Sequence, residues 1–160
     1  MVQNLSTIKA GHLASFTIEF EEPMGREHFT RVFETDQFKQ AQSVEIHCIL
    51  EFNLEDLVNF EHLKQFICGV RSLVEPEEIL QIRDTVSTFE NLETCVIMYQ
   101  SNGNLIRPFA ELLEEDVPEG PLERFTHRKF SEHHYQFIFI FIYSICNIDL
   151  VHVYRKSTIQ

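Results

Sequence analysis

The sequence Tyr-Gln-Phe-Ile-Phe-Ile-Phe-Ile-Tyr-Ser-Ile-Cys at residues 135–146 decides how the fold of this chain is interpreted. Over residues 137–142 aromatic and β-branched residues alternate, a composition that favours a strand over a helix. Successive side chains of a strand point to opposite faces, so phenylalanine would line one face and isoleucine the other. Because both faces are apolar, we expect this strand to be covered on both sides, inside a sheet or at a subunit interface.

Segments with strand and helix periodicity share the rest of the chain. They predict an α+β fold: a single globular domain over residues 1–160, with one sheet of about five strands and helices packed mainly on one face. The expected strands are residues 12–22, 43–52, 93–100, 135–146 and 148–154, and the expected helices are residues 26–38, 53–70, 76–89 and a short turn near 109–113.

Residues 53–70 carry the strongest helix signal. Asn53 is a suitable N-cap, and Glu55 and Asp56 stand in the first turn, where carboxylates interact favourably with the helix dipole. Apolar residues recur at i, i+3 and i+4 spacing, so one continuous amphipathic helix is predicted here. These residues are Leu54, Leu57, Val58, Leu63, Phe66, Ile67 and Val70.

Charge is distributed unevenly along the chain. Residues 1–123 hold 8 Lys and Arg against 23 Asp and Glu, a balance of −15, whereas residues 124–160 hold 5 against 2, a balance of +3. The reversal follows an acidic loop with proline and glycine near residues 114–121. An acidic body disfavours nucleic acid and favours a basic protein partner, or the basic tail of a second copy. The simpler alternative is an acidic surface that keeps the chain in solution.

The four cysteines, Cys48, Cys68, Cys95 and Cys146, lie far apart and form no C-x-x-C pair. They are typical of buried thiols in a reducing compartment. The N-terminal residues lack the basic-then-apolar order of a signal peptide, and no apolar window predicts a membrane-spanning helix. We therefore expect a cytoplasmic or nuclear protein with no membrane contact.

No motif assigns a catalytic, cofactor-binding or metal-binding residue. The chain has neither a glycine-rich phosphate loop nor a Gly-x-Ser-x-Gly turn. His127, His133 and His134, with Glu123 and Glu132 nearby, resemble a metal cluster in composition. However, adjacent histidines of a strand point to opposite faces, and their spacing matches no known ligand pattern. We predict no cofactor and no metal.

A basic, aromatic segment before residues 135–146 is the candidate interaction surface. It comprises Phe125, Arg128, Lys129, Phe130, His133 and Tyr135. The high phenylalanine content and the lack of catalytic motifs favour a non-enzymatic protein–protein interaction module, acting in a complex or as a homodimer. The alternative is a small enzyme or ligand-binding domain whose apolar pocket is lined by phenylalanine and histidine.

Overall fold

The computed structural model describes residues 14–19, 26–47, 53–70, 75–100, 105–120, 122, 124–129, 135–141 and 148–155. Within them the chain forms strands, α-helices and one 3₁₀ helix, η1. In chain order these are β1 (Ser15–Glu19), α2 (Arg26–Phe33), α3 (Asp36–Gln40), β2 (Ser43–His47), η1 (Leu54–Phe60), β3 (Gln65–Gly69), α4 (Glu78–Ser87), β4 (Thr94–Gln100), α5 (Ile106–Leu112), β5 (Arg124–Lys129), β6 (Tyr135–Phe141) and β7 (Ile148–Arg155).

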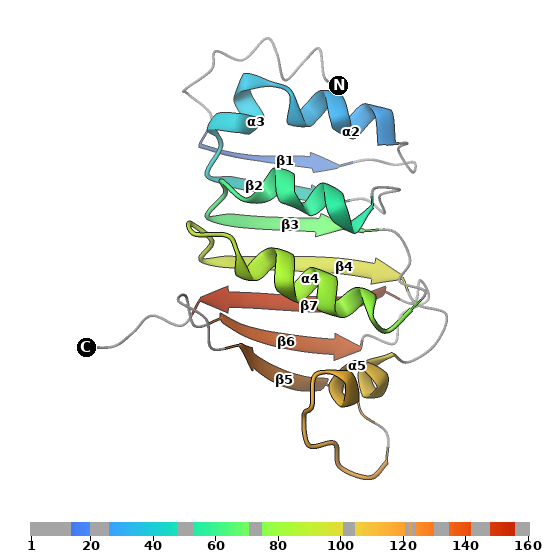
Figure 1. Cartoon of the computed structure of the whole chain (residues 1–160). Helices are drawn as coiled ribbons and strands as arrows, with labels where there is room; N and C mark the ends of the chain where they lie inside the picture. Colours follow the sequence, from blue (N-terminus) through green and yellow to red (C-terminus); the bar gives the residue numbers. More distant parts are fainter. Residues whose placement is uncertain are drawn as a thin grey trace, which may run out of the picture.

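The strands form one mixed sheet in the order β1-β2-β3-β4-β7-β6-β5 (Figure 1). Strands β1 to β4 are parallel neighbours, and the pairs β4–β7, β7–β6 and β6–β5 are antiparallel. The expected α+β class with a single sheet is confirmed. The sheet has seven described strands, because β3 and β5 add to the five that were expected. Strand β6 lies between β5 and β7 in the sheet, while the expected covering of both its faces stays a prediction.

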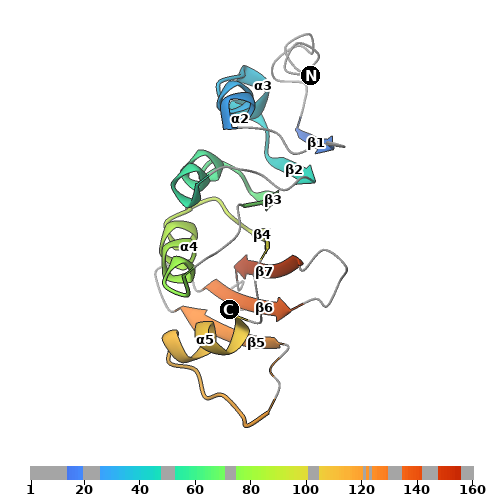
Figure 2. The ribbon, with the colours of Figure 1, turned by 90° about the vertical axis from the view of Figure 1, so that its right-hand side faces the viewer.

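All the described helices cover the same face of the sheet, as the edge-on view in Figure 2 shows. The cause is topological: strands β1 to β4 follow one another in chain order, and right-handed crossovers in a constant direction place every crossover helix on one side. The opposite face receives no helix from the described part of the chain. None of the described helices is long and apolar enough to cross a membrane.

The three crossovers end in the same short pattern of buried residues. A phenylalanine lies five residues before each strand, a small or aliphatic residue lies two before it, and the second and fourth strand residues face the helices. The main chain repeats too: the carbonyls of Ala14, Gln42 and Lys64 each accept hydrogen bonds from two successive N–H groups of the next repeat. The pattern is Phe38, Ala41, Val44, Ile46; then Phe60, Leu63, Phe66, Cys68; then Phe89, Leu92, Cys95, Ile97.

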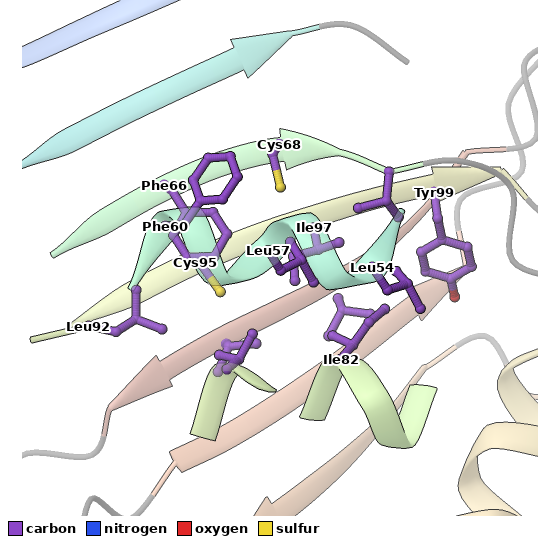
Figure 3. Packing of buried hydrophobic residues seen from close by; sticks show 14 of the residues in the cluster. Leu54, Leu57, Phe60, Phe66, Cys68, Ile82, Leu92, Cys95, Ile97 and Tyr99 are labelled. Carbon is purple, nitrogen blue, oxygen red and sulfur yellow. The ribbon is translucent and has the colours of Figure 1, made fainter. Parts of the chain in front are cut away.

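The repeated phenylalanines stack into the core of the helix-covered face. Ring centroids are 5.7 Å apart for Phe38 and Phe60, 4.8 Å for Phe60 and Phe66, and 6.4 Å for Phe66 and Phe89. Such aromatic pairs contribute about 0.5–1.5 kcal/mol beyond the burial of their area. Figure 3 shows Phe60 and Phe66 packed beside Cys95 and Leu92. Each repeat is thus held to the next by aromatic contact.

The predicted helix over residues 53–70 was wrong in its second half. It begins as expected, since the Asp56 carboxylate accepts a 2.9 Å hydrogen bond from the Asn53 N–H. It ends at Phe60 as η1, and residues 65–69 form β3 instead. Phe66, Cys68 and Val70 also satisfy the two-residue period of a strand, and pairing with both β2 and β4 decides in favour of it.

The other expected elements agree with the structure more closely. The helix predicted over residues 26–38 is two helices, because Thr35 caps α3: its hydroxyl oxygen accepts from the Phe38 N–H at 3.2 Å. Residues 113–120 form the expected acidic loop without helix or strand. Residues 124–129, expected only to lead into the next strand, form the edge strand β5.

Replacing Phe60 with alanine should lower the free energy of unfolding by about 3–5 kcal/mol, because the ring is fully buried among Phe33, Phe38 and Phe66. Urea unfolding followed by circular dichroism measures this change. The control is Val58→Ala in the same helix, where the side chain is 50% exposed and the expected change is within about 0.5 kcal/mol. Equal losses in the two variants would show that the phenylalanine ladder does not hold the repeats together.

Candidate functional site

The face of the sheet opposite the helices, called the open face from here on, is the candidate site. Its side chains come from alternate positions of β2, β3, β4 and β7, because the intervening positions face the helices. Most are half-buried by their neighbours in the sheet, and no described helix lies over them. They are Ser43, Glu45, His47, Gln65, Ile67, Thr94, Val96, Met98 and His152.

The strand register aligns these residues in rows across the sheet. One row, called the central row, crosses every strand and has an aliphatic middle between polar residues. Ile67 and Val96 stand at its middle, flanked by the Glu45 carboxylate on one side and the His152 imidazole on the other. In full it runs Thr17, Glu45, Ile67, Val96, His152, Ile138, Thr126.

A shallow hollow of about 180 Å³ lies over the middle of the open face. Glu45, Ile67 and His152 line it, together with Ser43, Gln65, Thr94 and Val96. Phe66 and Cys95 also border it, but they are only 2% and 1% exposed, so they contribute little surface. Pockets for drug-sized ligands are about 300–1,000 Å³. The hollow can therefore receive one or two side chains of a partner, and it is small for an enclosed ligand.

Hydrogen bonds fix the polar side chains beside the hollow. His152 Nε2 lies 3.1 Å from the Thr94 hydroxyl, which in turn donates to the Val153 carbonyl at 3.1 Å. On β2, His47 Nε2 lies 3.0 Å from Glu45 Oε2. These pairs orient the two histidines, and they offer a partner hydrogen-bonding groups in fixed positions.

The parallel strands β1 to β4 are the acidic part of the sheet, whereas β5 is basic. Strands β1 to β4 contain Glu19, Glu45 and His47 but no lysine or arginine. A partner with basic side chains would meet complementary charge on this face.

The interaction surface predicted from sequence falls at the far edge of the same sheet. Phe125, Arg128 and Lys129 belong to β5, and Tyr135 opens β6 opposite Lys129. The strand register aligns Arg128 with Thr94 and Gln65, which belong to the open face. Phe125, Lys129 and Tyr135 fall in neighbouring rows, which contain no residue of the open face. Phe130 and His133 lie outside the described residues. The predicted surface and the open face are thus different parts of the molecule, joined through the row of Arg128.

Of the three histidines that were considered and rejected as a metal site, only His127 lies within the described residues. Its Nδ1 lies 2.8 Å from Glu115 Oε1, and this contact ties β5 to the acidic loop. Arg107 holds the same loop by donating to the carbonyls of Pro118, at 2.8 Å, and Gly120. Across the described ranges, no group of three or more His, Cys, Asp or Glu is arranged to hold a metal ion.

Sequence reasoning missed the open face. Ile67 was assigned to a helix, and the register that places it beside Val96 and Glu45 exists only in the folded sheet. A signal was present: the spacing of Phe38, Phe60 and Phe89 from the strands that follow reveals three repeats. Once the repeats are aligned, the first and third strand positions mark the open face.

The comparisons with known proteins give one match. A family model described as the FTH domain matches residues 1–116. This range covers the four parallel strands and α5, and it stops before the antiparallel strands β5, β6 and β7. No match was found among curated proteins or among solved structures.

The buried thiols yield a prediction about chemical modification. Cys68 and Cys95 are buried thiols, and burial, with a smaller effect of neighbouring Cys68, raises the pKa of the Cys95 thiol well above its usual value. Both should react with iodoacetamide at pH 8 at least about a hundredfold more slowly in the native protein than in urea. Mass spectrometry of the labelled peptides measures this ratio. Rapid native labelling at Cys95 would mean that β3 and β4 open easily.

Proposed function

The chain belongs to the FTH domain family, and from this premise we propose that it is a non-enzymatic protein–protein interaction module that binds a protein partner through the open face of its sheet. The matched region contains the repeats that build this face. The single observation that carries the proposal is the central row. It presents aliphatic side chains between hydrogen-bonding groups on a surface with no helix over it in the described structure.

The arrangement resembles the general anatomy of a protein interface, in which an apolar centre is surrounded by polar groups. Ile67 and Val96 supply the centre, and Met98 extends it along β4. Glu45 and His152 supply the surroundings, each in a fixed position. The shallow hollow would accept a protruding side chain of the partner, the usual position of an energetically dominant contact.

Charge favours a partner with a basic contact surface. The parallel strands β1 to β4 carry carboxylates without lysine or arginine, and residues 1–123 have a balance of −15. A partner that places a lysine or arginine beside Glu45 and an aliphatic side chain over Ile67 would satisfy both features. Such charge pairing accelerates association and selects among partners.

Photocrosslinking tests which face is used. A benzophenone amino acid at position 96, on the open face, should crosslink a partner in native extract. The same amino acid at position 58, an exposed apolar position on the helix side, should give little product. Crosslinking at position 58 alone, or equal crosslinking at both positions, would contradict the proposal.

Once the crosslinked partner is purified, Glu45→Lys should weaken its binding at least about tenfold, equivalent to about 1.4 kcal/mol, because a repulsive charge replaces an attractive one. Glu55→Lys makes the same change in net charge on the exposed surface of η1 and should alter affinity by less than about twofold. Isothermal titration calorimetry at two salt concentrations measures both effects. Equal weakening by the two variants would show that Glu45 acts only through the net charge of the protein.

Light scattering on a sizing column shows whether the partner is a second copy of this chain.

A further inference from the structure

We propose that the outer edge of β1 is a second binding site, which takes an extended segment of a partner protein as an additional strand. The segment would alternate apolar residues, facing the α2–α3 side, with polar or basic residues on the open face. This site meets the central row at Thr17 but uses the main chain of β1, so it does not rest on the function proposed for the open face. The main chain of β1, the end of the repeats, the contrast with β5 and the position of α2 and α3 support it.

The main chain of β1 has hydrogen-bonding groups directed away from β2. The Ala14 carbonyl accepts from the Gln42 and Ser43 N–H groups, so Ala14 faces β2. In a parallel pair alternate residues bond to the same neighbour, so Ser15, Thr17 and Glu19 direct their N–H and C=O groups outward. A strand at the end of a sheet with such groups is a template for another strand.

Within the described residues, the hydrophobic ladder of the repeats stops at β1, and no polar cap follows it. The equivalent helix-facing residues of β2 and β3, Val44 and Phe66, are buried, whereas Phe16 on β1 is only partly buried. Repeat arrays usually end in a unit with a polar outer face. Here an apolar side chain from an added strand would pack against Phe16 as the next member of the ladder.

The two edge strands of the described sheet differ in their charged residues. Strand β5 carries Arg124, Arg128 and Lys129, and charged residues, especially lysine, block edge-to-edge pairing. Strand β1, with the sequence Ser-Phe-Thr-Ile-Glu, has no lysine, arginine or proline. Its Ser15 and Thr17 side chains are small and exposed, so they do not obstruct a neighbouring strand.

The position of helices α2 and α3 determines which side chain row of an added strand would have to be apolar. Figures 1 and 2 show the two helices beyond the level of β1 at this end of the molecule. An added strand would lie beneath them, with one side chain row facing the helices and the other facing the open side. The side chains of the first row must be apolar. In the second row, a basic residue near Glu19 would make a favourable charge interaction. These constraints favour one alternating strand over a second copy, whose own α2 and α3 would compete for the same space.

The test uses a fluorescein-labelled peptide, acetyl-Lys-Val-Thr-Val-Lys-Val-Thr-amide, and the full chain. Fluorescence anisotropy should show that the wild-type protein binds the peptide at micromolar protein concentration. The Thr17→Pro variant should bind it at least tenfold more weakly. That substitution removes an outward N–H and leaves the bonds to β2. Thr17→Val, which keeps the N–H and the branched shape, should bind as the wild type does. Ile67→Asp, on the open face, should also bind the peptide normally.

Amide exchange by NMR locates the contact in the wild-type protein, whether or not Thr17→Pro folds. The Thr17 and Glu19 amides should exchange rapidly in the free protein and be protected by the peptide. The proposal is overturned if the peptide does not bind in the high micromolar range, if Thr17→Pro binds normally while folded, or if these amides are already protected without peptide. Loss of peptide binding in Ile67→Asp would mean that the peptide binds the open face and not the edge of β1. Failure of open-face crosslinking would leave the result at β1 unaffected.

Discussion

The order in which the parallel strands follow one another across the sheet is the constraint on which the rest of this structure depends. Strands β1 to β4 are added in chain order, and crossovers of one hand then place every connecting helix on the same face. A sheet whose order reversed would bring helices to both faces. Here one face acquires the aromatic core built around Phe38, Phe60 and Phe89, while the other keeps the half-buried side chains of the central row. The division into a helix-covered core and an open face therefore follows from topology.

The repeated phenylalanine explains how unequal crossovers produce a regular sheet. The first crossover contains α2 and α3, the second contains η1, and the third contains α4. Each nevertheless delivers a buried ring five residues before the next strand, so the strand starts stay in register although the preceding helices differ in kind and length. Register on the open face is consequently set by packing on the opposite face. A change in the phenylalanine ladder would displace Glu45, Ile67 and Val96 relative to one another without touching any of them.

Local signals sufficed for some elements of this fold and failed for others. The alternation in β6 and the helical period of α4 are unambiguous within a few residues, so both were predictable. In β3, Phe66 and Val70 fit a helix with the preceding leucines and also fit a strand with Cys68, and only the partners β2 and β4 resolve the choice. Sequence reasoning missed the candidate site for the same reason. Arg128 and Phe125 stood out by composition, whereas Ile67, Val96 and His152 become neighbours only through the register of three strands.

The same topology makes the two ends of the sheet unequal. Beyond β4 the chain reverses direction, and β7, β6 and β5 close that end with an antiparallel unit whose last strand is basic. At the other end the parallel array stops at β1, where Thr17 begins the central row and is aligned with Glu45. A strand added to β1 would place one of its own side chains at the head of that row, next to Thr17 and in line with Ile67. The edge and the open face would then form one continuous surface, and a partner with an extended segment beside a basic, aliphatic patch would engage both.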